Sequence, residues 1–251
     1  AGTMPPCYPV AGFIPVRMVM RVLVVENYQN TGLGNVGAAL AEAKAELDVR
    51  RPYLGEELPS DASQHDALVM FGGGQNALAD DTHPYFPALL DLIRDFEARD
   101  RSVLGICLGS QLLARAFGGT NQVGGATEFG WCGVTLTEAA KSDAVLGAMP
   151  VAFPIFQWHD DTFSLPPGAV RLAGSMVAEN QAFRLGRAVY AFQFHFEADR
   201  AVVNHWSTAF AETVAARWPD WPQRLEAETA RNGALADQSG LAIARAWVAT
   251  I

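Results

Sequence analysis

The chain has 251 residues, of which half are hydrophobic and 18% are charged, so it can form one large α/β domain or two small ones and is not expected to be disordered. The chain contains 18 Lys and Arg and 27 Asp and Glu, which gives a formal net charge of −9, and its sequence has no run of basic residues. This balance argues against nucleic acid or an anionic lipid surface as a partner.

The N-terminal part of the chain carries no expected membrane span or secretion signal. The apolar stretch 10–25 contains two arginines, is too short to cross a bilayer, and runs into a predicted strand without a cleavage-like boundary. Residues 1–19, which begin with a Pro- and Gly-rich stretch, are expected to be an N-terminal extension or a cloning remnant, with Met18 or Met20 as a natural start.

The cysteines bear on the redox compartment. Cys7, Cys107 and Cys132 are far apart in sequence and form no CxxC pair or disulfide framework. This usage favours a reducing compartment, and we expect a soluble, cytoplasmic protein.

From residue 20 onward the pattern alternates between strands and helices. Apolar β-branched runs predict strands, and helical spacing of apolar residues predicts helices. The expected strands are 20–26, 47–52, 67–71 and 102–106, and the expected helices are about 36–46, 84–99 and 110–117. Their short connections indicate βαβ units around a parallel sheet.

The second half of the chain has a different pattern. Between Gly130 and Phe196, strands separated by Pro and Gly turns are expected to complete the sheet and to add antiparallel strands, and three amphipathic helices should follow at about 199–216, 221–232 and 238–250. We therefore expect an α/β fold with a mostly parallel central sheet flanked by helices. Its domain would cover residues 20–200, with a C-terminal helical extension at 201–251 packed on the same domain.

Cys107 is the strongest candidate for a catalytic group. It lies in Gly105-Ile-Cys-Leu-Gly109-Ser-Gln111, between a predicted strand and a predicted helix. Such a turn holds a side chain at the carboxyl edge of the sheet, and the flanking glycines permit unusual backbone angles. The dipole of the following helix favours the thiolate. A buried, inert cysteine is the usual alternative, and the strand–turn–helix context argues against it.

His195 and Glu197 are the candidates for a base and its orienting carboxylate. They belong to the run Tyr190-Ala-Phe-Gln-Phe-His-Phe-Glu197. Residues two apart in a strand share a face, so both side chains are expected to project into one cleft. Histidine exchanges protons near neutral pH, and a carboxylate orients it and stabilises its charged form.

The sequence resembles the class I (triad) glutamine amidotransferases in two motifs. These are Gly-Ile-Cys-Leu-Gly-Ser-Gln and, further along the chain, the Phe-His-Phe-Glu of residues 194–197. The chain is most similar to standalone members that are like the glutaminase domain of GMP synthase. The resemblance covers roughly residues 20–200 and implies a flavodoxin-like fold. The resemblance also implies that Cys107, His195 and Glu197 form a catalytic triad. It implies an oxyanion hole formed by the N–H groups of Gly73 and Leu108, and substrate contacts made by Gly72 and Gln111.

Two positions depart from the family pattern. Phe196 stands where the family usually has proline between the triad residues, and this exchange keeps the spacing. Gly74 stands where many relatives have proline, which predicts a more mobile oxyanion loop. By itself the glycine run 72–74 is more typical of a plain loop. Its position after the strand that precedes the nucleophile strand favours an oxyanion site, because it exposes backbone N–H groups at a strand end.

Other polar residues have less specific patterns. His159 and Asp161, in Gln-Trp-His-Asp-Asp, are expected either at the substrate entrance or a partner surface, or in a structural hydrogen-bonded loop. His65, His83 and His205 lack metal-ligand spacing, so we expect surface or packing roles and no bound metal.

Two further patterns limit the expected chemistry. Cys132 lies beside Trp131 in an apolar strand and is expected to be buried and unreactive. A GxxxxGK[ST] phosphate loop is missing from the sequence, which argues against an ATP-using synthetase, and no cofactor is expected.

The expected reaction is hydrolysis of the γ-amide of glutamine through a thioester on Cys107, with the ammonia passing to a separate acceptor synthase. The alternative is a γ-glutamyl peptidase or hydrolase that acts on γ-glutamyl amides with the same triad, and only the pocket beyond the scissile bond distinguishes the two. A non-catalytic stress or chaperone-like protein with a cysteine elbow is disfavoured, because Leu108 rather than His follows the cysteine and because such proteins lack the His-x-Glu run. The intact triad argues against a degenerate protein that only binds.

Overall fold

The computed structural model describes residues 19–251. Nearly all of the expected extension at residues 1–19 therefore lies outside the described residues, as does Cys7.

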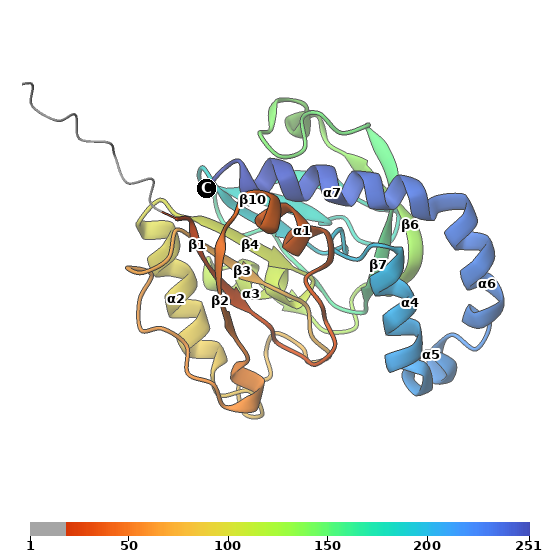
Figure 1. The fold of residues 1–251 in the computed structure, drawn as a ribbon, viewed down its shortest axis with the longest axis horizontal. Helices are drawn as coiled ribbons and strands as arrows, with labels where there is room; N and C mark the ends of the chain where they lie inside the picture. Colours follow the sequence, from red (N-terminus) through yellow and green to blue (C-terminus); the bar gives the residue numbers. More distant parts are fainter. Residues whose placement is uncertain (1–18) are drawn as a thin grey trace, which may run out of the picture.

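Within residues 19–251 the chain forms a nine-stranded mixed sheet with helices on both faces (Figure 1). Its parallel part, in spatial order, is β2 (Glu46–Arg50), β1 (Arg21–Val25), β3 (Ala67–Met70), β4 (Ser102–Ile106) and β11 (Val189–Phe192). Antiparallel strands continue the sheet as β10 (Ala182–Leu185), β9 (Val170–Gly174), β6 (Glu128–Leu136) and β7 (Ala152–His159). A separate ribbon pairs β5 (Asn121–Gln122) with β8 (Thr162–Phe163). The expected α/β fold with a parallel core and added antiparallel strands is confirmed.

Except for the edge strand β2, the parallel strands are mostly apolar because both of their faces are covered. Val22 and Val24 of β1 belong to one core cluster, and Leu23 and Val25 belong to the other. This alternation follows from the period of two residues in a strand. The first cluster lies under α1 (Gly34–Glu42) and α7 (Ala234–Val248), which run side by side in Figure 1, and the second lies under α2 (Phe86–Ala98) and α3 (Leu108–Ala116).

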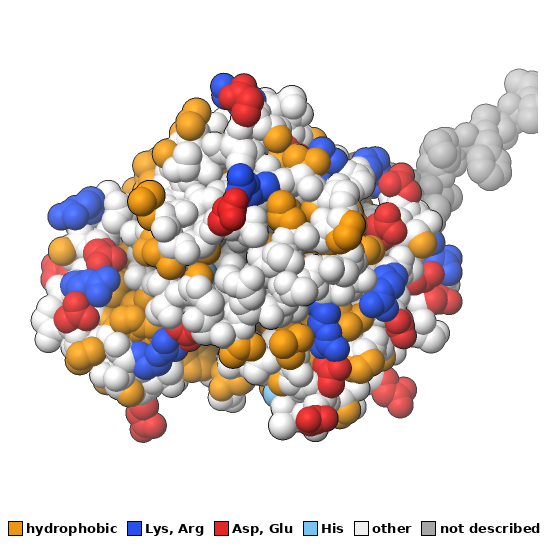
Figure 2. Space-filling view, turned by 180° about the vertical axis from the view of Figure 1, so that it is seen from behind, with side chains coloured by type: hydrophobic (Ala, Val, Ile, Leu, Met, Phe, Trp, Pro, Cys, Tyr) orange, Lys and Arg blue, Asp and Glu red, His pale blue; other side chains and the backbone are white. Residues whose placement is uncertain are grey.

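The remaining helices extend beyond the antiparallel end of the sheet. They are α4 (Arg200–Ala209), α5 (Ala211–Arg217) and α6 (Trp221–Glu228), and they lie beside β6 and β7 in Figure 1. From there α7 returns across the sheet to pack on α1 and β7. On the face seen in Figure 2, acidic and basic side chains are intermingled. None of the helices in residues 19–251 combines the length and the apolar character that crossing a bilayer requires.

The helix expected at 36–46 is wrong at both ends. The observed α1 begins at Gly34 and ends at Glu42, because Lys44 adopts a positive φ of 57° and the amide of Ala45 bonds back to the carbonyl of Leu40 at 3.0 Å. Strand β2 then starts at Glu46. The alanine-rich composition that predicted a longer helix does not reveal this tight turn.

The C-terminal helices also differ from their expected boundaries. The segment expected as one helix breaks at Phe210 into α4 and α5. The gap expected between residues 232 and 238 is absent, because the π-helical turn Thr229–Gly233 joins α6 directly to α7, which begins at Ala234. Gly233 packs closely in this turn, because a Cβ there would lie 2.6 Å from Cδ of Arg200.

The start of α1 and the middle of α7 together hold the backbone of residues 196 and 197. The side chain of Asn35 donates to the carbonyl of Phe196 at 2.9 Å, and its backbone N–H donates to the carbonyl of Glu197 at 2.9 Å. Gly240 of α7 lies so close that a Cβ there would be 2.1 Å from the Phe196 carbonyl oxygen. Close packing at this point is possible only without a side chain at residue 240.

We predict that Gly240→Ala destabilises the protein by about 2 kcal/mol, because the added methyl group overlaps the Phe196 carbonyl. Alanine in an uncrowded helix position would instead stabilise by about 1 kcal/mol. Urea unfolding measures the difference. Gly133→Ala is the matched control, since a Cβ at residue 133 meets nothing within 4 Å. Equal stability of the two variants would contradict the prediction.

Candidate active site

Cys107 occupies a sharp turn between β4 and α3. Its φ of 52° and ψ of −110° are unusual for a residue with a side chain. The turn is fixed on both sides: the Cys107 amide donates to the carbonyl of Phe192 at 2.8 Å, and its carbonyl accepts from the hydroxyl of Ser110 at 2.6 Å. Such strain persists only where the surrounding structure determines it, and it is typical of functional sites.

The two glycines that flank Cys107 make the turn sterically possible. A Cβ at Gly105 would lie 2.4 Å from the carbonyl oxygen of Gly109, and a Cβ at Gly109 would lie 2.3 Å from the carbonyl oxygen of Met70. Helix α3 therefore packs directly on β3 and β4 and begins immediately after the cysteine, earlier than the expected residue 110. The N-terminus of α3 starts at the sulfur-bearing residue, as the sequence indicated.

His195 and Glu197 follow β11 rather than belonging to it. The strand expected through residue 197 is wrong at its end, because regular pairing stops at Phe192. His195 instead forms an isolated antiparallel bridge with Phe156 of β7, in which its amide donates to the Phe156 carbonyl at 2.8 Å. The expected alternation of side chains still holds. Phe194 and Phe196 belong to the hydrophobic core cluster, whereas His195 and Glu197 do not.

The His195 imidazole and the Glu197 carboxylate form a close buried pair. Nδ1 of His195 lies 2.7 Å from Oε1 of Glu197, and the two residues are 6% and 1% exposed. Burial disfavours the charged ring, but the negative charges of Glu197 and Cys107 and their hydrogen bonds outweigh it and raise the pKa of His195 well above 6.5. These interactions therefore favour the protonated ring.

The glycine run after β3 lies against both Cys107 and His195. A Cβ at Gly72 would be 3.2 Å from Cε1 of His195 and 3.4 Å from Cβ of Cys107, and a Cβ at Gly73 would be 2.9 Å from Cδ2 of Leu108. Three sequence segments that are far apart along the chain thus meet at the carboxyl edge of the parallel strands. Ligands of open α/β sheets bind at this edge.

All nine residues named from the sequence line one cavity of about 490 Å³: Gly72, Gly73, Cys107, Leu108, Gln111, His159, Asp161, His195 and Glu197. Gln111 of α3 is buried and donates through Nε2 to Oε1 of Gln193 at 3.2 Å. The structure brings the residues together, and their roles remain proposals.

The structure places His159 and Asp161 at the edge between the cavity and a loop. They line the cavity, and they also belong to a hydrogen-bonded loop in which Nδ1 of His159 lies 3.1 Å from the Asp161 carbonyl oxygen. The Asp161 carboxylate accepts from the amide of Gly124 at 2.8 Å. On its other side, Nε2 of the buried His159 ring lies 3.3 Å from Oε2 of Glu128.

Sequence reasoning missed several residues around the cavity. Gln193 orients Gln111, and Glu128 faces His159 while accepting from the hydroxyl of Ser175 at 2.8 Å. The C-terminal helices contribute further lining residues, which are Trp206, Phe210, Thr213 and Arg217. Glu128 and Gln193 interrupt apolar strand patterns, and that interruption was the available signal. The helix residues had no signal beyond an amphipathic pattern.

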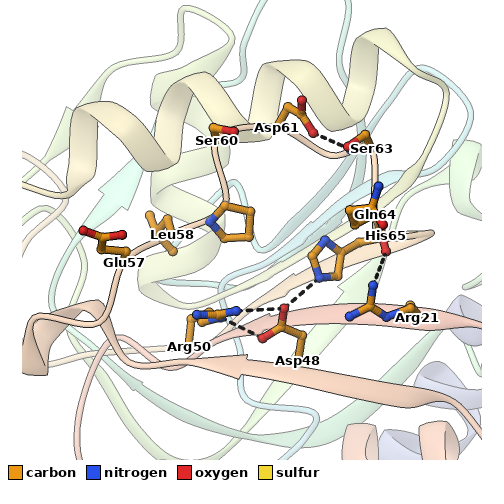
Figure 3. Close-up of a pocket in the computed structure, with 11 residues that line it drawn as sticks. Arg21, Asp48, Arg50, Glu57, Leu58, Ser60, Asp61, Ser63, Gln64 and His65 are labelled. Atoms are coloured by element: carbon orange, nitrogen blue, oxygen red, sulfur yellow. Dashed lines mark hydrogen bonds and ion pairs between the residues drawn. The ribbon is translucent and has the colours of Figure 1, made fainter.

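A second cavity of about 410 Å³ lies at the β2 edge of the sheet, away from these residues (Figure 3). There Asp48 accepts from Nε of Arg50 at 2.7 Å and lies 3.0 Å from Nε2 of His65, while Arg21 donates to the Gln64 carbonyl at 3.1 Å. These bonds tie the loop before β3 to the sheet edge. His65 is a packing residue here, as the sequence indicated.

Cys132 differs from its expected burial. It is only partly buried on β6. Burial of part of the side chain, with the nearby charges of Glu128 and Glu228, raises the pKa of its thiol to about 11. A thiol of this kind is a poor nucleophile at neutral pH. Residues 19–251 contain no group of His, Cys, Asp and Glu side chains suited to a metal ion.

Comparison with known proteins gives consistent results. Residues 23–205 match the family described as glutamine amidotransferase class-I. A glutamine amidotransferase-like protein of Salmonella typhimurium is 33% identical over 67% of this chain and 73% of its own length. A glutamine-hydrolysing GMP synthase subunit of Methanoregula boonei is 30% identical over 73% of this chain and 92% of its own.

Two solved structures are similar over almost the whole chain. A glutamine amidotransferase from Thermotoga maritima superposes with a TM-score of 0.80 at 27% identity, covering 91% of this chain and 98% of its own. A glutamine amido transferase from Methylobacillus flagellatus gives 0.81 at 28% identity, covering 93% and 96%.

We predict that Glu197→Gln slows alkylation of Cys107 by iodoacetamide at pH 7. Removing the carboxylate charge lowers the pKa of His195, so less positive charge faces the Cys107 sulfur. Mass spectrometry of the separate peptides measures the rates. Cys132 is the internal control, and an unchanged Cys107 rate would refute the coupling.

Proposed function

Since this chain belongs to the class-I glutamine amidotransferase family, we propose that it hydrolyses the γ-amide of glutamine to glutamate and ammonia, with Cys107 as the nucleophile. The observation that carries the proposal is the strained Cys107 turn beside the buried His195–Glu197 pair. In this pair Nδ1 of His195 lies 2.7 Å from Oε1 of Glu197. A nucleophile, a base and an orienting carboxylate in one cavity are the parts that acyl transfer requires.

The first half of the reaction forms a thioester. The Cys107 thiolate attacks the γ-carbonyl carbon of glutamine, and the negative charge that develops on the carbonyl oxygen is received by the N–H groups of Gly73 and Leu108. One such donor is typically worth about 3–4 kcal/mol of transition-state stabilisation. Protonated His195 gives its proton to the leaving ammonia.

The second half releases glutamate. The neutral His195 ring takes a proton from water as the water oxygen attacks the γ-glutamyl thioester. The C–S bond then breaks, which releases glutamate and restores the Cys107 thiolate beside the protonated ring. Glu197 keeps the ring oriented through Nδ1 and stabilises its charged form in both halves. Gly72 and Gln111 hold the glutamyl part of the substrate, and Gln193 keeps the Gln111 amide in place.

We also propose that a separate synthase accepts the ammonia. The support is indirect: two of the similar proteins, from Methanoregula boonei and Natronomonas pharaonis, are glutamine-hydrolysing GMP synthase subunits. In the same way, the contacts of α7 with α1 and β7 support the proposal that residues 201–251 belong to one domain with residues 20–200.

We predict that Cys107→Ala lowers glutamine hydrolysis by a factor on the order of 10³ or more, as loss of a nucleophile does in other triad enzymes. Ammonia release measured with a coupled dehydrogenase tests this. Cys132→Ala is the matched control and should retain activity, because its thiol lies on β6 outside the cavity. Full activity of Cys107→Ala, with an unchanged thermal unfolding curve, would refute the assignment of the nucleophile.

A separate experiment tests the thioester. Hydroxylamine competes with water for an acyl-enzyme, so the wild-type protein should convert glutamine into γ-glutamyl hydroxamate in its presence. The yield should rise with hydroxylamine concentration while total glutamine consumption stays constant or increases. Glutamine hydrolysis without any hydroxamate, at hydroxylamine concentrations far above those of the protein, would rule out an accessible γ-glutamyl thioester.

A further inference from the structure

One side of the active-site cavity is built from aromatic rings. Tyr28, Trp158, Trp206 and Phe210 all line it, and we refer to them as the aromatic wall. The Phe210 ring is centred 5.7 Å from Trp158 and 6.0 Å from Tyr28, and Trp158 is centred 6.0 Å from Trp206. Aromatic pairs prefer such separations, and rings arranged in this way can accept a further aromatic ring.

Part of the aromatic wall lies beyond the segment that matches the family. The family match ends at residue 205, whereas Trp206 and Phe210 come from the end of α4. The exposed Thr213 of α5 lies beside them at the cavity. The family match therefore does not account for Trp206 and Phe210, and the reason for these two rings is sought in their place at the cavity.

The aromatic wall is held firmly in place. Nε1 of Trp206 donates to the carbonyl oxygens of Asn30 and Thr31 at 2.9 and 3.1 Å, which attaches α4 to the loop after β1. The guanidinium of Arg217 forms a two-pronged ion pair with Asp160, which attaches α5 to the loop beside His159. Preorganised walls of this kind cost little ordering entropy when a ligand binds.

The position of His195 shows which part of a substrate the aromatic wall would contact. In the proposed reaction His195 protonates the leaving nitrogen, so the leaving group must lie on the His195 side of Cys107. The ring centroid of Trp206 is 5.0 Å from that of His195, in an edge-to-face arrangement. Ammonia would leave the aromatic wall without any contact.

The charges of the cavity narrow the class of leaving group further. An amino acid or peptide leaving group carries a carboxylate, which needs a cationic partner. Arg217 is the one Lys or Arg among the described lining residues, and Asp160 already occupies its guanidinium. The cavity volume of about 490 Å³ lies within the roughly 300–1,000 Å³ of pockets that bury drug-sized ligands.

From these contacts we propose that the site hydrolyses γ-glutamyl arylamides, with the uncharged aromatic amine packed against Trp158, Trp206 and Phe210. The inference rests on the proposed function, because it uses the same nucleophile and acid. The Cys107 sulfur bonds to the γ-carbonyl carbon, the C–N bond breaks, and the arylamine leaves with a proton from His195. Water then cleaves the thioester, so that arylamide and water give glutamate and arylamine.

The experiment measures kcat/KM of the full chain for glutamine, γ-glutamylanilide and γ-glutamylglycine. We expect γ-glutamylanilide to be hydrolysed at least as well as glutamine, and γ-glutamylglycine to be the poorest substrate. In Phe210→Ala the ratio of the anilide to the glutamine value should fall about tenfold, because a ring–ring contact is lost. Comparing ratios between variants cancels the different intrinsic reactivities of the amides.

Two further variants keep the test clear. Phe117→Ala removes a similarly half-buried phenylalanine that caps the C-terminus of α3, as Phe210 caps α4, and it should leave the ratio unchanged. Thr213→Trp alters an exposed residue at the cavity and should lower the ratio by filling the space for the amine. It serves as the test if Phe210→Ala does not fold.

The outcomes separate the two proposals. Hydrolysis of glutamine without hydrolysis of the anilide, or a ratio that neither Phe210→Ala nor Thr213→Trp changes, overturns the arylamide inference alone. Hydrolysis of the anilide but not of glutamine, lost in Cys107→Ala, supports the inference and refutes glutamine as the substrate. Failure on all three substrates refutes both.

Discussion

The active site depends on how the chain is held just after β11. Beyond Phe192 the segment leaves the regular sheet, yet it must present His195 to Cys107 and Glu197 to His195. The backbone bridge to Phe156 fixes the histidine, and Asn35 fixes the carbonyl of Glu197. Both contacts come from elements distant in sequence, so the geometry of the pair is a property of the whole fold.

Much of this arrangement was predictable because it follows from local patterns. The apolar runs of the parallel strands and the Gly-x-Cys-x-Gly spacing indicate a strand, a turn and a helix, and the structure shows them there. The glycines at 105 and 109 are required by close backbone contacts, which is why the motif identifies the turn so well. Alternation also placed His195 and Glu197 together correctly, although the strand itself ends earlier.

The features that could not be predicted depend on contacts between distant segments. Nothing local distinguishes Gly233, which packs on Arg200, from a glycine that ends a helix. The turn at Lys44 is likewise set by a single residue with positive φ inside an alanine-rich stretch. The cavity residues Trp206 and Phe210 lie on an amphipathic helix whose pattern shows that one face is buried, but not what that face borders.

The π-helical turn at Thr229–Gly233 has a consequence for the rest of the molecule. A π turn contains one residue more than an α turn, and each residue advances a helix by about 100° around its axis. The turn therefore sets the rotational phase of α7, and with it which residues face the sheet. Ile243 and Trp247 are fully buried in the core, and Gly240 meets the carbonyl of Phe196. A single additional residue, more than 30 positions after the triad, thus determines how closely α7 can approach the backbone that carries Glu197.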